Sequence, residues 1–364
     1  MIQISPVITQ HEVVELIKLL HDARHIVICA HRSPDGDAVG SSLGLADYLR
    51  SLGKIPQIIM PNAFPDFLRW MPGSRDIMFY DGKETEAKAK INEADLIFML
   101  DFCALDRLQN MQEAVAHSKC KRIMIDHHLN PDRKAASLVI SHPQACSTCE
   151  IVFRLIWQMG GYEQMTRSGA ACIYTGMMTD TGSFTYASKR PEIYYIIGQL
   201  LQKGIDKDKI YRNVNNNYSE NRLRFVGYVL NSKLKFYVNQ KASIFTITRE
   251  EMKEYHYIRG DAEGLVNMPL QVRGMKLSIS LREDTERDVI RVSLRSVDDF
   301  PCNKMAEAFF NGGGHLNASG GELPFPLDNA VKIAESEGIV LVFLCSTQEI
   351  LSGWQSRRIG DDIS

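Results

Sequence analysis

The stretch CAHRSPDGDAVGSS, residues 29–42, crowds a histidine and two aspartates around a turn that contains proline and glycine. It follows the apolar run HIVICAH (25–31), whose length and continuous hydrophobicity are typical of a strand covered on both faces. A segment with helical spacing of apolar residues (39–49) begins directly after it. This order of strand, polar turn and helix predicts the start of a parallel α/β sheet.

The same pattern continues through the first half of the chain. Three further runs have the length and composition of buried strands: IPQIIMP (55–61), DLIFMLD (95–101) and RIMIDHH (122–128). We therefore expect an α/β fold whose N-terminal part is a doubly wound, mainly parallel sheet. In such a sheet, ligands bind beyond the carboxyl ends of the strands.

The second half of the chain has a different pattern of apolar and polar residues. The runs LSISLRE (277–283) and IRVSLRS (290–296) alternate apolar and polar residues, which is typical of strands with one half-exposed face. A polar, Asn-rich segment (212–224) lies between the two halves and indicates a linker or hinge. We expect a second, smaller α/β domain with a mixed sheet, and an active-site cleft between the two domains.

Length and charge limit the classes of function. A chain of 364 residues is long enough for two hydrophobic cores. The 42 Lys and Arg residues nearly balance 44 Asp and Glu, and the net charge of -2 argues against binding of long duplex nucleic acid. A small anionic substrate that is met by bound cations is compatible with this charge. No segment resembles a signal peptide or a membrane span, so we expect no membrane partner and a cytoplasmic location.

Cysteine usage agrees with a reducing compartment. The eight cysteines are scattered, and several lie in apolar runs, which is typical of buried free thiols. Cys146 and Cys149 form a C-x-x-C pair in ACSTCEIVFRL, which could indicate a metal or redox site. A second pair at zinc-finger spacing is missing from the sequence, and the segment has the pattern of a helix start. We therefore favour a structural role for this pair.

Histidines and aspartates gather at the expected ends of strands and of one helix. They are His31, Asp35 and Asp37 after the first strand, Asp101 after the third, Asp126, His127 and His128 after the fourth, and Asp180 after a helix that begins near residue 168. Any one of these aspartates could be a helix cap or a turn residue. Four groups at matching positions of a parallel sheet are harder to explain by capping, and they predict one shared site.

Such a site requires cations. Several carboxylates within a few ångströms repel one another, and burial would force some of them to take up protons. Carboxylate-rich sets with one or two imidazoles suit Mn²⁺ or Mg²⁺. Six ligands are too many for one ion that keeps positions open, whereas two ions that share a bridging carboxylate would use them all. Two ions about 3.5 to 4 Å apart activate a water molecule and stabilise the attacking and the leaving oxygen of a phosphoryl displacement.

A glycine-rich stretch, FFNGGGHLNASGG (309–321), follows a helical pattern near the end of the chain. One interpretation is a helix that ends at glycine and continues into a flexible turn. The alternative is a turn at 312–315 whose backbone approaches a ligand closely and offers N–H groups to an anion. The sequence alone leaves both open.

Taken together, these motifs resemble one family. HRSPDGDAVGS, DFCALDR, DHH and TDTGSF, in this order, resemble the four motifs of the DHH phosphoesterase superfamily, and VSLRS followed by GGGHLNASGG resembles its DHHA1 domain. The most similar subgroup is the stand-alone bacterial nanoRNase and 3'-phosphoadenosine 5'-phosphate (pAp) phosphatase type, also labelled exopolyphosphatase-related. The expected domains are a DHH metal-binding catalytic domain at 1–190, a helical linker or hinge at 191–230, a DHHA1 substrate-binding domain at 231–347 and a tail at 348–364.

The resemblance implies a role for each residue of the first domain. One ion would bind His31 and Asp35, the other would bind Asp37, His127 and Asp180, and Asp101 would bridge the two. His128 would contact the scissile phosphate and assist proton transfer. Asp126 would orient an imidazole from outside the metal shell.

The resemblance also implies substrate contacts. Five residues of the second domain would bind the phosphate and sugar: Arg295, Gly312, Gly313, Gly314 and His315. The planar donor fork of arginine suits phosphate oxygens, and glycine amides suit a closely approaching anion. Arg107, in DFCALDR, is a further candidate, for which a surface salt bridge is the alternative.

The predicted activity is hydrolysis of short oligoribonucleotides, of pAp, or of both, by in-line attack of a hydroxide that bridges two metal ions. Mn²⁺ is the expected metal, with Mg²⁺ or Co²⁺ as alternatives, and a homodimer is left open. A phosphodiesterase for linear or cyclic dinucleotides (pApA, cyclic di-AMP) is the second hypothesis, and an exopolyphosphatase or pyrophosphatase is the third. The alternative without catalysis is a silent nucleotide-binding module.

Overall fold

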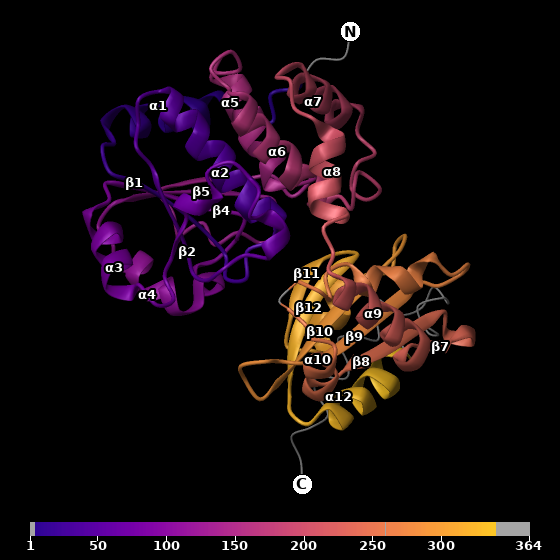
Figure 1. Cartoon of the computed structure of the whole chain (residues 1–364). Helices are drawn as coiled ribbons and strands as arrows, with labels where there is room; N and C mark the ends of the chain where they lie inside the picture. The colour runs from indigo at the N-terminus through magenta and orange to yellow at the C-terminus, as the bar shows by residue number, and fades with distance from the viewer. Residues whose placement is uncertain (1–3, 259, 340–364) are drawn as a thin grey trace, which may run out of the picture. The chain divides into compact units, whose positions relative to one another are not determined.

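The computed structural model describes residues 4–258 and 260–339. The chain forms two compact units, which divide between Asn217 and Tyr218 (Figure 1). This division falls within the segment expected to be a hinge, which is largely helical: it contains α7 (Pro191–Gln202), α8 (Lys207–Asn215) and α9 (Glu220–Tyr228). The tail expected at 348–364 lies outside the described residues, and the domain bounds stay a prediction.

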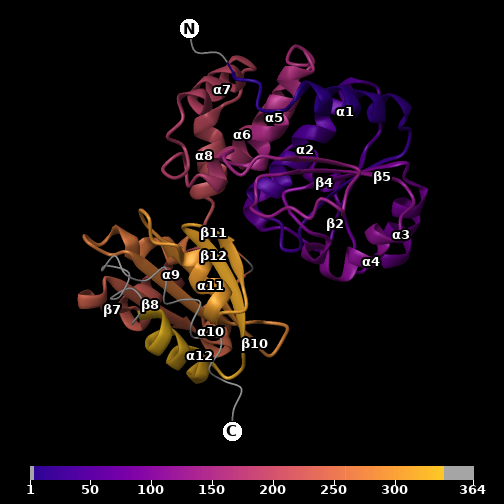
Figure 2. The ribbon, with the colours of Figure 1, turned by 180° about the vertical axis from the view of Figure 1, so that it is seen from behind.

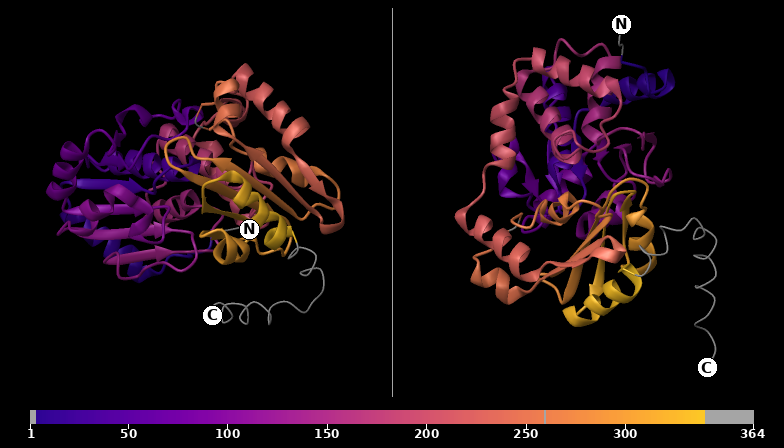
Figure 3. Two further views of the ribbon diagram at one scale, coloured as in Figure 1. Left: turned by 90° about the horizontal axis from the view of Figure 1, so that it is seen from below. Right: turned by 90° about the vertical axis from the view of Figure 1, so that its right-hand side faces the viewer.

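The first unit contains a six-stranded sheet in the order β3-β2-β1-β4-β5-β6. All neighbouring strands are parallel, as the left view of Figure 3 shows. The strands are β1 (Ile26–Ala30), β2 (Gln57–Met60), β3 (Met78–Phe79), β4 (Leu96–Leu100), β5 (Lys121–Asp126) and β6 (Leu138–Ser141). The four predicted strands are confirmed, and the two edge strands, β3 and β6, were not predicted.

Helices cover both faces of this sheet (Figures 1 and 2). Ile26 and Ile28 of β1 pack on one face with α1 (Gln10–Asp22) and α2 (Gly36–Ser51), and α5 (Thr148–Gln158) and α6 (Arg167–Asp180) join the same core. Val27 and Cys29 pack on the other face with α3 (Glu84–Glu93) and α4 (Gln112–Ala116). Burial on both faces explains why β1 has no polar alternation, and the doubly wound prediction is confirmed.

Glycines allow α2 and α6 to lie unusually close together. A Cβ on Gly40 would come within 2.6 Å of the Cys172 carbonyl oxygen in α6. A Cβ on Gly44, one turn further along α2, would come within 2.6 Å of Ile173 Cγ1. Side chains at these two positions would push the helices apart. Their close packing brings the N-terminus of α2 beside the C-terminus of α6.

The second unit contains a mixed six-stranded sheet in the order β11-β12-β10-β9-β8-β7. Its strands are β7 (Lys235–Tyr237), β8 (Ala242–Ile247), β9 (Leu277–Glu283), β10 (Val289–Ser296), β11 (Gly313–His315) and β12 (Ala318–Pro324). β8 and β9 are parallel, and the other neighbours are antiparallel. The predicted mixed sheet is therefore confirmed.

The two faces of this sheet differ. One face of β10 packs its apolar residues against α11 (Cys302–Phe309) and α12 (Leu327–Ile333), which lie together in Figure 2. The opposite face of β10 carries Arg291, Ser293 and Arg295, which are half-buried. A second core around β8 includes α9 and α10 (Arg249–Glu254). Among the described residues, every helix is too short or too polar to span a bilayer.

Candidate metal centre

Three adjacent strands of the first unit end at one place. β1, β4 and β5 are parallel neighbours, so their carboxyl ends meet at the same edge of the sheet. His31 follows β1, Asp101 follows β4, and His127 and His128 follow β5. Asp101 has a φ of 65°, a left-handed conformation that is uncommon outside glycine and often found at functional sites.

His31, Asp35 and Asp101 form one group of facing side chains. His31 Nε2 lies 3.5 Å from Asp101 Oδ2 and 4.0 Å from Asp35 Oδ2. Asp35 is also the N-cap of α2, because its Oδ1 accepts the N–H groups of Asp37 and Ala38 at 3.0 and 3.1 Å. One oxygen of Asp35 therefore caps the helix, as the capping interpretation predicted, while the other faces His31.

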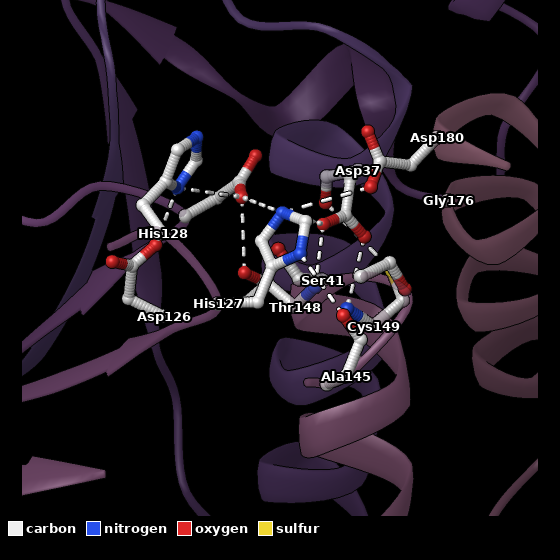
Figure 4. Close-up of polar contacts among 12 residues, drawn as sticks. Asp37, Ser41, Asp126, His127, His128, Ala145, Thr148, Cys149, Gly176 and Asp180 are labelled. Carbon is white, nitrogen blue, oxygen red and sulfur yellow. Dashed lines mark hydrogen bonds and ion pairs between the residues drawn. The ribbon is translucent and has the colours of Figure 1, made fainter. Parts of the chain in front are cut away.

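Asp37, Asp101 and His127 form a second group, with Asp180 beside it (Figure 4). His127 Nε2 lies 3.6 Å from Asp101 Oδ1, 3.8 Å from Asp37 Oδ2 and 3.6 Å from Asp180 Oδ2. Asp180 ends α6 and Asp37 lies in the first turn of α2, so the close packing of these two helices brings the two carboxylates together.

Both histidines turn the same ring nitrogen to the carboxylates. Nδ1 of His31 lies 2.8 Å from the Arg32 carbonyl oxygen, and Nδ1 of His127 lies 3.4 Å from that of Ala145. A carbonyl oxygen only accepts hydrogen bonds, so Nδ1 carries the proton and, in the neutral ring, Nε2 presents a lone pair. Burial lowers the pKa of His31, which favours this neutral form. The same arrangement orients histidine ligands of metal ions.

The centre has an excess of negative charge. Asp37 and Asp101 are almost fully buried, and their ion pairs within the described residues all run to histidines. Burial raises the pKa of Asp101 well above its usual range, and the neighbouring carboxylates of Asp37 and Asp35 raise it further. A neutral imidazole cannot offset these charges, so the group is stable in its ionised form only with added positive charge.

The side chains fit divalent cations. The N···O distances of 3.5 to 4.0 Å are too long for hydrogen bonds. Two ligands that each lie about 2.1 Å from one ion can be up to about 4.2 Å apart. Oxygen donors with imidazole nitrogens are also the ligands that suit Mn²⁺ and related ions. The spacing and the chemistry of these donors therefore match sites for cations.

His128 and Asp126 form a pair next to the centre. Asp126 is fully buried, and its Oδ1 accepts a hydrogen bond from His128 Nδ1 at 2.7 Å. Burial alone would raise the pKa of Asp126, but the contact with His128 holds it below its usual value. Asp126 thus orients the imidazole of His128, whose side chain is 24% exposed and accessible to a substrate.

Arg107 lies exposed in the 3₁₀ helix Leu105–Met111, which follows β4. Its carbonyl oxygen accepts the N–H of Arg32, the residue after His31, at 2.8 Å. The positive charge of Arg107 contributes to the lowered pKa of His31, so the guanidinium lies near the centre. It forms no ion pair with any residue that the structure describes, and the surface salt bridge considered from the sequence is absent there.

Two candidate residues of the second unit, Arg295 and His315, lie on the strands that flank β12. Arg295 of β10 and His315 of β11 are both directly opposite Ala318 of β12, so they share one face of the sheet. The Arg295 guanidinium donates to the Leu294 carbonyl oxygen. The structure therefore brings Arg295 and His315 together within this unit.

The expectation of a turn at 312–315 is wrong, because Gly313–His315 form the edge strand β11. A Cβ on Gly312 would come within 1.8 Å of the Gly320 carbonyl oxygen, and one on Gly314 within 2.6 Å of that of Ala318. Gly314 also has a φ of 140°. Two of the three glycines are thus required by packing against β12. A Cβ on Gly313 would meet no such obstacle, so steric contacts do not explain why this position is a glycine.

The start of α5 also reaches the centre, which sequence reasoning missed. The backbone N–H groups of Thr148 and Cys149 donate to the two oxygens of Asp37 at 2.6 and 2.9 Å. Cys146 and Cys149 are buried free thiols at this helix start, as predicted. The only available signal was the S-x-x-E pattern from Ser147 to Glu150, which marks a helix N-terminus but not what it faces.

Comparisons with known proteins agree with this geometry. The model of the DHH family, N-terminal domain, matches residues 25–177, and that of the DHHA1 domain matches residues 239–337. The solved structure of an exopolyphosphatase-related protein from Bacteroides fragilis is 52% identical and has a TM-score of 0.88; the match covers 93% of this chain and 99% of that one. The chain therefore belongs to the DHH family of phosphoesterases and carries a DHHA1 domain, as the resemblance implied. Proteins of this family use divalent metal ions.

More distant relatives cover both units. The bifunctional oligoribonuclease and PAP phosphatase NrnA of Thermus thermophilus is 29% identical over 82% of this chain and 84% of its own length. The protein of the same name from Bacillus subtilis is 26% identical over 88% of this chain and 95% of its own length. The chain is thus similar to these enzymes along nearly its whole length.

Proposed function

We propose that this chain is a phosphoesterase that uses two divalent cations, with Mn²⁺ as the preferred metal, to hydrolyse short oligoribonucleotides and pAp. One observation carries the proposal of two metals. Asp101 turns Oδ2 to His31 and Oδ1 to His127, so a single buried carboxylate faces two separate groups of ligands. A bridging carboxylate between two ions has this arrangement.

The proposed ligands follow from these two groups. One cation would be held by His31, Asp35 and Asp101, and the other by Asp37, Asp101, His127 and Asp180. When bound, the two cations would lower the pKa of a water molecule and offset charge on the phosphate oxygens.

Residues around the centre would bind the phosphate and move protons. The bond from Nδ1 of His128 to Asp126 would orient the imidazole for proton exchange with the reacting phosphate ester. Arg107 has no ion-pair partner among the described residues, so its guanidinium is available for a phosphate oxygen.

The second unit would bind the rest of the nucleotide. Arg295 and His315 share one face of the sheet, and β11 is an edge strand, so part of its backbone is free of strand pairing. We propose that Arg295, His315 and the amides of Gly313 and Gly314 bind phosphate and sugar oxygens. The Gly312 N–H donates to the Ala306 carbonyl oxygen at 3.1 Å, so this glycine would not offer its amide to the substrate.

The names of the relatives support this choice of substrate, because the similarity to both NrnA proteins extends over both units. A cytoplasmic location and independence from membranes and from long duplexes belong to the same proposal. The net charge of -2 supports the last of these.

The test is a side-by-side assay of the purified chain with Mn²⁺ on five substrates: a 5-mer RNA, pAp, pApA, cyclic di-AMP and pyrophosphate. We expect mononucleotides from the RNA and inorganic phosphate from pAp. Asp101→Asn should lose both activities, whereas Asp261→Asn, a change at a buried carboxylate of the second unit, should keep them. Cleavage of cyclic di-AMP or pApA alone would favour the dinucleotide phosphodiesterase. Hydrolysis of none would favour a nucleotide-binding module.

A further inference from the structure

The segment from Ala145 to Glu150 has no part in the function proposed above, yet it contacts three of the proposed ligands (Figure 4). We propose that Thr148, at the N-terminus of α5, is a positioning residue that orients Asp101 and Asp37 for the two cations. This inference rests on the proposed two-metal centre.

Asp37 is held by the backbone of α5. Its Oδ2 accepts the N–H of Thr148 at 2.6 Å, and its Oδ1 accepts the N–H of Cys149 at 2.9 Å. The first N–H groups of a helix have no partner within the helix, and the helix dipole favours negative charge at this end. Both oxygens of Asp37 are thereby fixed in position.

Asp101 is held by the side chain of Thr148. The Thr148 hydroxyl donates to Asp101 Oδ1 at 2.9 Å, and both residues are almost fully buried. Each carboxylate oxygen has two lone pairs, so this bond uses one and leaves the others for ions. Tilting the carboxylate plane would break the bond, so Thr148 fixes the plane in which the two equivalent oxygens of Asp101 face His31 and His127.

The same segment orients His127. The Ala145 carbonyl oxygen lies 3.4 Å from His127 Nδ1. The next residue, Cys146, donates its N–H to Glu150 Oε2 at 2.7 Å, which ties this turn to α5. One short segment thus sets the orientation of side chains that come from α2, from the end of β4 and from the end of β5.

Capping of α5 does not require the Thr148 hydroxyl. The hydroxyl of Ser147 accepts the N–H of Glu150 at 3.1 Å and serves as the N-cap. A valine at position 148 would keep the shape and the backbone N–H and lose only the bond to Asp101. Thr148→Val therefore separates positioning from helix formation.

The experiment is a titration of metal-free protein with Mn²⁺ in which free Mn²⁺ is followed by electron paramagnetic resonance. Thr148→Val should weaken Mn²⁺ binding by about 10- to 100-fold, the usual effect of losing a partner that orients a metal ligand. Thr148→Ser keeps the hydroxyl and should bind like the wild type. The matched control is Thr175→Val, because Thr175 is equally buried but donates its hydroxyl to the Ala171 carbonyl oxygen within α6. Thermal unfolding of the metal-free variants confirms that each one folds.

Two results separate this inference from the proposed function. If the wild type binds two ions and Thr148→Val binds them equally tightly, Thr148 is no positioning residue and the two-metal centre stands. The same conclusion holds if Thr148→Ser is as weak as Thr148→Val. If the wild type binds no Mn²⁺, the two-metal centre itself is overturned, and the role of Thr148 with it.

Discussion

Helix α5 contacts two buried ionic clusters that differ in their charge balance. Its N-terminus contacts the metal centre, where Asp37 and Asp101 face histidines across 3.5 to 3.8 Å. Glu150, in the first turn of α5, and Arg154, one turn further along, belong to a cluster of two carboxylates and two guanidinium groups. Its ion pairs are Arg154 to Glu150 at 2.8 Å, Arg154 to Glu192 at 2.7 Å, Arg190 to Glu150 at 2.6 Å and Arg190 to Glu192 at 3.8 Å.

The difference separates a structural cluster from a functional one. In the arginine cluster every carboxylate contacts a cation of the protein at hydrogen-bond distance, so the charges are offset within the fold. In the metal centre the carboxylates outnumber the positive groups, and the gaps between them exceed hydrogen-bond length. The charges of the first cluster are offset within the fold, whereas the ion pairs of Asp37 and Asp101 among the described residues run only to histidines, which supports the proposed cation sites.

The largest expected effect is that of Asp101→Asn on activity. Loss of the shared carboxylate should lower kcat/KM by about 10³-fold or more, because both cations lose a ligand. The metal-free protein should unfold at the same or a higher temperature than the wild type, since a repelling charge has been removed. Activity close to wild type with Mn²⁺ would contradict the assignment of Asp101.

The arginine cluster should give the opposite result. Arg154→Met leaves the fully buried Glu150 with only one guanidinium, and we expect urea unfolding to show a loss of about 3 to 5 kcal/mol. The folded variant should keep its activity. Adding Glu150→Gln to this variant should recover part of the loss, because it removes the uncompensated charge. Loss of activity without loss of stability in Arg154→Met would show that the arginine cluster is not a purely structural cluster.

A moderate effect is expected at the contact of α2 with α6. Gly40→Ala places a methyl group against the Cys172 carbonyl oxygen and should cost about 1 to 3 kcal/mol of stability. Because these helices carry Asp37 and Asp180, Mn²⁺ binding should weaken as well. Gly227→Ala, where a Cβ meets nothing within 4 Å, is the matched control and should change neither quantity.

The smallest effect concerns acid stability. Hydrogen bonds from the Ser5 side chain and, after it, from the Arg154 guanidinium and the Ser5 N–H lower the pKa of Glu192 from 4.5 to about 2. A lowered pKa in the folded state stabilises the protein above about pH 4.5, and this contribution is lost as the pH falls towards 2. Glu192→Gln should therefore be less stable than wild type at pH 7, and the difference should shrink below pH 4.5 in urea titrations at several pH values. A difference that does not depend on pH would rule out this carboxylate as the cause.

Much of the fold could be predicted because its signals are local. β1, β4 and β5 are buried on both faces, so each is a continuous apolar run of strand length. The polar residues directly after these runs lie at one edge because the strands are parallel and adjacent. His31, Asp101 and His127 could therefore be placed together before any coordinates were known.

The features that could not be predicted depend on contacts between segments that are distant in the sequence. β3 has only two residues, too few for a hydrophobic pattern, and β11 consists of two glycines and a histidine. A close approach of a ligand to the backbone was one of two interpretations of the glycine run, and neither included the approach of β12 to Gly312 and Gly314. Thr148 lies 47 residues from Asp101 in the sequence, and only the fold brings the two together.

The most direct test of the two-metal centre is the number of Mn²⁺ ions bound per chain, measured by electron paramagnetic resonance on metal-free wild type and on Asp101→Asn. We predict two ions for the wild type, with a spectrum of two coupled Mn²⁺ ions, and loss of this coupled pair in Asp101→Asn. A wild type that binds fewer than two ions, or an Asp101→Asn variant that binds a coupled pair with unchanged affinity, would contradict this prediction.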